Sequence, residues 1–283
     1  MSDNFKYTSI IMSKTEYQRG RRAWFTPFGQ GAKPHPPTVN SAKRRTASSA
    51  KRVAPADGAH GRSKICFITA IYGGYEQSCK KFVKQSIDTD FICFTDNNNI
   101  INNGWTIDTT PYHLINKNKM DDDTYTNSLC NNKHTFNIAK YYKQSFLNIP
   151  ILEKYDVIVW LDGTIEIIYD KTSEYILNNI YKEKIIGWHH EKRYGLLHKE
   201  VMASHTEKYT STKWNGQSQP YQDIDKQYKC YLEDGYNELF FKNIKSHTPH
   251  MGVWITCFVA FLQKDEDVKN FLDMWYLQTL KYT

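Results

Sequence analysis

The sequence lacks the short motifs that mark several large classes of enzyme. It contains no G-x-G-x-x-G fingerprint and no G-x-x-x-x-G-K-[ST] loop, which counts against a dinucleotide oxidoreductase and a P-loop kinase. It contains no G-x-S-x-G nucleophile elbow, so an α/β-hydrolase is disfavoured. Its six cysteines include no C-x-x-C pair and no short Cys/His ligand spacing, so neither a zinc module nor a disulfide framework is indicated.

Long apolar runs are also missing. The longest one covers residues 252–262, whereas a helix that crosses a membrane needs about 20 apolar residues. The N-terminal residues, MSDNFKYTSIIMSK, include no continuous apolar segment of the kind found in signal peptides. We therefore expect a soluble, cytoplasmic protein without a transmembrane segment.

Acidic residues are scarce in the first part of the chain, and this scarcity accounts for its basic character. The 283 residues carry a formal charge of +7. Residues 1–62 hold twelve Lys or Arg but three acids, a net charge of +9, so residues 63–283 carry −2. Five of the nine prolines lie in the first part, and no isoleucine occurs between Ser13 and Lys64. The sequence therefore predicts a disordered basic N-terminal arm, residues 1–62, and one folded domain, residues 63–283.

The folded part alternates short apolar runs with longer amphipathic stretches, a pattern typical of an α/β sheet. Near-continuous apolar runs predict buried strands, the first two parallel, at residues 64–70, 90–96 and 156–162. Further strands are predicted at residues 104–112, 165–168, 184–190 and 252–262. Helices are predicted at residues 133–147, 194–205, 223–233 and from residue 265 onward, the last capped by Asp265 or Asp267.

One acid follows directly after the most strand-like run in the chain. The run Val157–Leu161 ends at Asp162, and Gly163 comes next. In open α/β sheets, ligands bind beyond the carboxyl ends of strands, so a carboxylate at this place faces the ligand crevice. A carboxylate suits a hard divalent cation that bridges two phosphates. The spacing alone fits equally well with a simpler role, in which Asp162 caps a turn.

Two other predicted strands end in polar signatures at the same sheet edge. Thr69, Ala70, Tyr72, Gly73 and Gly74 lie at the end of the first strand, and Thr95 and Asp96 end the second. Backbone amides near paired glycines can approach a phosphate or a ribose, and a carboxylate can accept from a sugar hydroxyl or a base. Each signal is weak by itself, and the convergence of three strand ends is stronger.

The segment HHEKRYGLLHKE contributes three further polar candidates. His190 and Arg193 are three residues apart, and Glu200 lies two helical turns beyond Arg193, on roughly the same side. An acid and a guanidinium over a pocket can bind sugar hydroxyls or a pyrophosphate, and the acid can act as general base. The alternative is an exposed, salt-bridged helix.

The order of these motifs resembles a known family. TAIYGGYE, DFICFTD, YDVIVWLDGTIEI, HHEKRYGLLHKE and DKQYKCYLEDGY follow one another as in the plant mucilage-type hexosyltransferase-like domain and its bacterial and viral relatives. That family is similar to the GT-A glycosyltransferases. The resemblance covers about residues 64–283 and implies a GT-A-like, Rossmann-like fold, with a mixed, mainly parallel sheet flanked by helices.

The resemblance also implies a nucleotide-sugar donor, with a UDP-sugar expected first. It places the TAIYGGY loop with Thr95 and Asp96 around the nucleoside and Lys133 at the phosphates. It assigns a divalent cation, Mn²⁺ or Mg²⁺, to Asp162, although the motif Asp162-Gly163-Thr164 has no second acid at its third position. Gln227 is expected to orient the sugar.

The resulting hypothesis is a metal-assisted hexosyltransferase that acts on a hydroxyl of a glycan, protein or lipid. Glu200 or Asp223 would deprotonate that hydroxyl if the enzyme inverts. Relatives continue past the last aromatic helix, so we expect the domain to be shortened at Thr283. One alternative is a non-catalytic carbohydrate-binding or scaffold remnant of the same fold. Another is nucleic-acid binding through the arm, which the folded domain is not expected to share.

Overall fold

A computed structural model describes the chain at residues 8–10, 63–115, 135–189, 197–206, 210–214, 217–218, 221–237 and 254–282. Its strands are β1 (Thr8–Ile10), β2 (Ile65–Ile71), β3 (Thr89–Thr95), β4 (Thr106–Asp108), β5 (Val157–Leu161), β6 (Ile185–His189), β7 (Lys213–Trp214), β8 (Gln217–Ser218) and β9 (Trp254–Leu262). Its helices are α2 (Tyr112–Ile115), α4 (Thr135–Gln144), α5 (Thr172–Glu183), α6 (Leu197–Ser204), α8 (Ile224–Glu233) and α10 (Glu266–Tyr282), with short 3-10 helices at Phe146–Asn148 and Pro150–Leu152.

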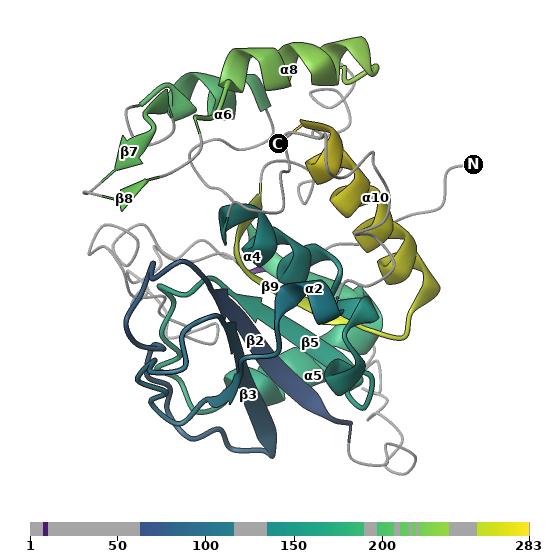
Figure 1. The fold of residues 1–283 in the computed structure, drawn as a ribbon. Helices are drawn as coiled ribbons and strands as arrows, with labels where there is room; N and C mark the ends of the chain where they lie inside the picture. The colour runs from purple at the N-terminus through teal and green to yellow at the C-terminus, as the bar shows by residue number, and fades with distance from the viewer. Residues whose placement is uncertain are drawn as a thin grey trace, which may run out of the picture.

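A seven-stranded sheet with the order β1-β6-β9-β5-β2-β3-β4 forms the centre of the fold (Figure 1). Strand β2 pairs in parallel with both β3 and β5, β3 with β4, and β1 with β6. Strand β9 runs antiparallel between β5 and β6. This mixed, mainly parallel sheet confirms the predicted fold class.

Edge strand β1 comes from the part of the sequence predicted to be a basic arm. Thr8–Ile10 pairs with Ile186, Gly187 and Trp188 of β6. The remainder of residues 1–62 lies outside the described residues. The domain division at residue 62 therefore stays a prediction, with one short strand of the sheet on its N-terminal side.

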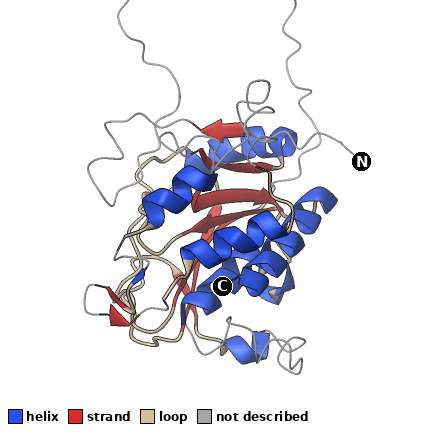
Figure 2. Ribbon diagram, turned by 90° about the horizontal axis from the view of Figure 1, so that it is seen from above, coloured by secondary structure: helices blue, strands red, loops and turns tan. Residues whose placement is uncertain are grey.

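Helices cover both faces of the sheet (Figure 2), and each face has its own apolar cluster. Ile176 and Ile180 of α5 pack on one face. Tyr141 and Tyr142 of α4 and Leu272 of α10 pack on the other. Every residue of β2 and β5 is buried, which is why both strands are near-continuous apolar runs in the sequence.

The predicted return strand at residues 165–168 is wrong. Ile167 makes a single parallel bridge with Phe82, and the segment belongs to no described strand. The strand predicted at residues 104–112 is shorter than expected and covers Thr106–Asp108. The carboxylate of Asp108 accepts from the Thr110 backbone N–H at 2.8 Å, which turns the chain directly after β4.

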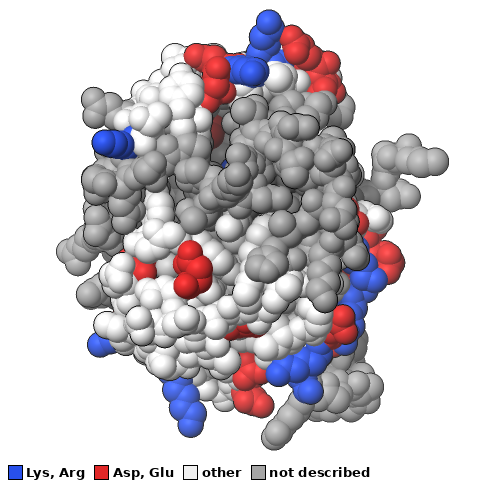
Figure 3. Space-filling model, viewed as in Figure 1, with Lys and Arg blue, Asp and Glu red and all other residues white. Residues whose placement is uncertain are grey.

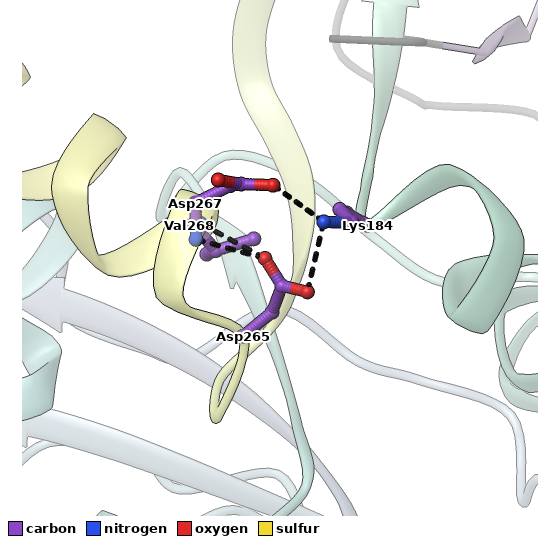
Figure 4. Close-up of polar contacts among 4 residues, drawn as sticks. All are labelled: Lys184, Asp265, Asp267 and Val268. Atoms are coloured by element: carbon purple, nitrogen blue, oxygen red, sulfur yellow. Dashed lines mark hydrogen bonds and ion pairs between the residues drawn. The ribbon is translucent and has the colours of Figure 1, made fainter. Parts of the chain in front are cut away.

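Lys184, the residue between helix α5 and strand β6, forms ion pairs with two acids at the start of helix α10 (Figure 4). The Lys184 ammonium lies 3.1 Å from Asp265 Oδ2 and 2.5 Å from Asp267 Oδ2. Asp265 Oδ1 also accepts from the backbone N–H groups of Asp267 and Val268. Asp265 is therefore the cap of the last helix, one of the two residues that the sequence offered for this role.

Charged side chains are mixed on the face of the molecule shown in Figure 3. On this face, the described Lys and Arg side chains lie next to Asp and Glu side chains at the top and at the lower right of the view, and separate basic side chains lie at the left. No helix in the described part of the chain has both the length and the apolarity needed to span a membrane.

Candidate functional site

The connectivity of the sheet creates a switch point between β2 and β5. From β2 the chain moves to β3 and β4 on one side, and β5 then pairs with the opposite side of β2. The segments that follow β2 and β5 lie side by side, because Phe82 forms a bridge with Ile167 and the Val83 N–H donates to the Ile167 carbonyl at 2.9 Å. In open α/β sheets, ligands bind beyond the carboxyl ends of the strands where the strand order reverses. A Cβ placed on Gly163 would lie 3.2 Å from Ile71 Cγ1, so the ends of these two strands are close together.

Two of the sequence candidates bind one another at this edge. The Gly73 backbone N–H donates to both carboxylate oxygens of Asp96, at 3.1 Å and 3.0 Å. Gly73 and Gly74 both have positive φ, 67° and 69°, which glycine adopts without strain. The loop after β2 is thereby fixed to the end of β3, and Asp96 itself is exposed at the carboxyl edge of the sheet.

Four other candidates at these strand ends are buried. Thr69, Ala70, Tyr72 and Thr95 are each at most 8% exposed. The Tyr72 hydroxyl is hydrogen-bonded to the Tyr142 hydroxyl at 2.8 Å, and burial raises the pKa of the Tyr72 phenol. The Thr95 hydroxyl accepts from the Asn97 backbone N–H at 3.1 Å. These side chains therefore belong to the packed interior next to Gly73 and Asp96 and are not exposed at the sheet edge.

Asp162 lies at the carboxyl end of β5, as the sequence predicts, and its carboxylate is hydrogen-bonded to a side chain of that strand. Trp160 Nε1 donates to Asp162 Oδ1 at 2.7 Å. The two side chains are two residues apart and so share one face of the sheet, the face covered by α4 and α10. The Asp162 backbone N–H donates to the Cys257 carbonyl of β9 at 2.8 Å. The Asp162 side chain remains 44% exposed.

The structure adds Lys143, a residue that the sequence analysis did not select. Its ammonium lies 3.6 Å from Asp162 Oδ1 and donates to Thr256 Oγ1 at 3.0 Å. It also lies over the rings of Trp160 and Trp275, at 5.6 Å and 5.8 Å from their centroids. The side chain is 13% exposed, so this cation is held in place by its surroundings.

The partly buried thiol of Cys257 lies in the same electrostatic environment. Burial raises the pKa of Cys257 to about 12, the negative charge of Asp162 adds to the rise, and the positive charge of Lys143 opposes it. Both charges are therefore close enough to Cys257 of β9 to affect its pKa. The thiol stays protonated at neutral pH.

The described residues around Asp162 do not fit a resident divalent cation. Asp162 is the one carboxylate at the end of β5, its Oδ1 is already engaged, and an ammonium lies 3.6 Å away. A second positive charge beside that ammonium is disfavoured, because like charges at this distance repel. Within the described ranges, no group of three or more His, Cys, Asp or Glu side chains is arranged to hold a metal ion.

The candidates on α6 and α8 form a separate group. These two helices pack on each other and lie above the sheet in the view of Figure 1. Glu200 is half-buried on α6. Asp223 is the N-cap of α8, and its Oδ1 accepts from the Lys226 backbone N–H at 3.0 Å. Gln227 hydrogen-bonds Tyr231 one turn later. Three further candidates, Lys133, His190 and Arg193, lie outside the described residues.

A cavity of about 760 Å³ lies at the opposite edge of the sheet. Its lining includes Lys64 and Ile65 at the start of β2 and Asp88, Thr89 and Asp90 at the start of β3. It is therefore at the amino ends of the parallel strands. Because ligand sites in open α/β sheets lie at the carboxyl ends, Asp96 and Asp162 remain the candidate site and this cavity does not.

Comparisons with known proteins give one structural likeness. No protein-family model matches the chain, and no curated protein matches it. Among solved structures, the fold is similar to the mannosyltransferase Ktr4p from S. cerevisiae, with 11% identity and a TM-score of 0.32. The match covers 78% of this chain and 62% of that one. A likeness at this level describes the course of the chain and says nothing about a substrate.

Proposed function

We propose that this protein is a glycosyltransferase that moves a hexose from a nucleotide sugar, UDP-linked in the first instance, to a hydroxyl acceptor. The observation that carries the proposal is that Gly73, Asp96 and Asp162 follow the carboxyl ends of β2, β3 and β5, beside the switch point, with the Gly73 N–H bound to Asp96. This edge of an open α/β sheet is where nucleotides bind. The family resemblance of the ordered motifs supports the same reading.

In this proposal the donor lies across the carboxyl edge of the sheet. Asp96, held by the Gly73 N–H, accepts from the nucleoside, while Thr69, Ala70, Tyr72 and Thr95 form the buried floor of that half-site. The diphosphate then extends toward Asp162. Lys133, Arg193 and His190 are the candidates for supplying positive charge as the bond between the sugar and the diphosphate breaks, because negative charge develops on the leaving group.

The acceptor is a glycan, protein or lipid hydroxyl that must lose a proton during the reaction. Glu200 and Asp223 are the two candidate bases if the enzyme inverts, and Gln227 is the candidate for orienting the sugar. The cap role of Asp223 favours Glu200, because a carboxylate that holds a backbone N–H is less available as a base. No step of this mechanism passes through a divalent cation, since the residues around Asp162 do not fit one.

A thermal-shift panel of nucleotide sugars tests donor binding on the full chain. A ligand that binds the native state at 100 times its Kd adds about 2.7 kcal/mol of stability, which raises the Tm of a chain of this size by roughly 5 to 10 °C. We expect UDP-sugars to produce this rise. Asp96→Ala should lose it, because the Asp96 carboxylate and the fixed Gly73 loop are removed together.

Asp88→Ala is the matched control for this panel. It removes one exposed acid at the amino edge of the sheet and should keep the full ligand-induced shift. A panel with no shift for any nucleotide sugar, with or without Mn²⁺, would refute donor binding. An equal shift in wild type and Asp96→Ala would move the donor away from this edge of the sheet.

A further inference from the structure

The ion pair between Asp162 and Lys143 changes what the strand-end carboxylate can bind. We propose that Asp162 binds a hydroxyl of the donor hexose directly, with Lys143 as its permanent counter-ion, and that donor binding needs no divalent cation. This inference rests on the proposed function. It concerns the chemistry of the same site and departs from the metal that the family resemblance implies.

The first argument is the number of contacts that already hold the carboxylate. Asp162 Oδ1 accepts from Trp160 Nε1 at 2.7 Å and faces the Lys143 ammonium at 3.6 Å. Among the described residues, no group donates to Oδ2, and the side chain is 44% exposed. One oxygen is therefore fixed while the other faces solvent, which suits a single hydrogen bond from a neutral hydroxyl donor.

The second argument is the fixed position of the cation. Thr256 accepts from the Lys143 ammonium, and the centroids of the Trp160 and Trp275 rings both lie within 6 Å of it. Aromatic faces attract an ammonium, and a lysine that is 13% exposed does not move into water without losing these contacts. Asp162 is thus already neutralised from within the protein, so a metal ion would meet a repulsive neighbour.

The third argument is the direction in which the donor extends. Asp96 and Gly73 lie at the ends of β3 and β2, and Asp162 lies at the end of β5 on the other side of β2. A nucleoside at the first pair places the diphosphate and then the hexose toward Asp162. The carboxylate is therefore expected to contact the sugar and not the nucleoside.

Calorimetric titration of the full chain with the UDP-sugar found in the panel, and with UDP alone, tests both parts. We expect the Kd of the UDP-sugar to agree within about twofold in EDTA and in Mn²⁺, since no cation is used. Asp162→Asn should weaken UDP-sugar binding about tenfold, the loss expected for one hydrogen bond to a charged group. Binding of UDP alone should stay unchanged.

Lys143 is a positioning residue in this account, so its test includes rescue by a conservative variant. Lys143→Met keeps an apolar stem near the two rings but removes the charge, and it should weaken UDP-sugar binding without affecting UDP. Lys143→Arg keeps the charge and should restore binding. Circular dichroism and the Tm without ligand establish that both variants fold, so that a loss of binding is not a loss of structure.

The outcomes separate this inference from the proposed function. Binding of the UDP-sugar only in the presence of Mn²⁺ leaves the glycosyltransferase proposal standing and overturns the direct hydroxyl contact. Equal loss of UDP and UDP-sugar binding in Asp162→Asn also overturns it. Absence of all nucleotide-sugar binding under both conditions overturns both proposals.

Discussion

The carboxylate of Asp223 already has a structural task, because it accepts from the Lys226 backbone N–H in the first turn of α8. Asp is among the preferred N-cap residues, and the bond satisfies a donor that the helix leaves unpaired. The sequence placed Asp223 both at a helix start and among the candidate bases. This hydrogen bond accounts for an aspartate at position 223 without a catalytic role.

A pair of substitutions separates these two roles of Asp223. Asp223→Asn keeps the cap and removes the base, so we expect α8 to keep its hydrogen-exchange protection and sugar transfer to stay at the wild-type rate. Asp223→Ala removes the cap and should lower the stability of α8 by about 1 kcal/mol. A fall in transfer of about 100-fold or more in Asp223→Asn would instead identify Asp223 as the base.

The sequence is sufficient to select Asp162 as a site candidate, but it is not sufficient to select Lys143. Asp162 follows a buried strand directly, and this local pattern is sufficient to select it. Lys143 is one of several lysines in its part of the sequence, and it becomes notable only because its side chain reaches from α4 to Asp162 and to Thr256 of β9. A contact between residues so far apart in the sequence depends on tertiary packing, which local patterns do not contain.

A glycine of β6 lies directly against a tryptophan side chain of β9. A Cβ placed on Gly187 would lie 2.6 Å from Trp254 Cε3, and the register of the pair shifts between Gly187 and Trp188. The indole of Trp254 thus fills the space where a side chain of residue 187 would be. The glycine is required by this close approach and not by its φ.

Gly187→Ala should destabilise the protein by about 1 to 3 kcal/mol, the usual cost of forcing extra atoms into a packed site. Urea denaturation of this variant, of Trp254→Ala and of the double variant measures the coupling between the two positions. We expect the Gly187→Ala penalty to be much smaller when Trp254 is already truncated. The same penalty in both backgrounds would show that the indole is not the obstacle.

At the level of helices and strands, the sequence predicts best the elements that are buried on both faces. β2, β3 and β5 agree with their predicted ranges to within two residues at each end. The antiparallel direction of β9 was not predicted, because an apolar run carries no information about direction. Helix α5 was not predicted either. Two of its buried residues, Thr172 and Ser173, are polar, which weakens the apolar periodicity.

Charge is distributed unevenly along the chain. The +7 charge of the chain is an average over a basic first part and a near-neutral remainder. The face in Figure 3 shows acids and bases intermixed among the described residues. The candidate site belongs to the near-neutral part, where the order of the strands brings Asp96 and Asp162 to one edge of the sheet.

The position of that site depends on the connection order more than on any single motif. Asp96 and Asp162 are 66 residues apart in the sequence, and they share an edge because β3 and β5 both pair in parallel with β2. The convergence of strand ends was therefore predictable once the strands were taken as parallel. The link from the Gly73 N–H to Asp96 depends on the conformation of a glycine turn, which the sequence permits but does not specify.

Sugar transfer itself is the most direct test of the proposed activity. The measurement is the release of UDP from a UDP-hexose by the full chain, with and without a panel of glycan acceptors, for wild type, Asp162→Ala and the exposed-acid control Asp170→Ala. We predict that wild type and Asp170→Ala release UDP at the same rate and that Asp162→Ala is slower by about 10-fold or more in kcat/KM. Equal rates in wild type and Asp162→Ala, or no release by wild type from any UDP-hexose, would contradict the account.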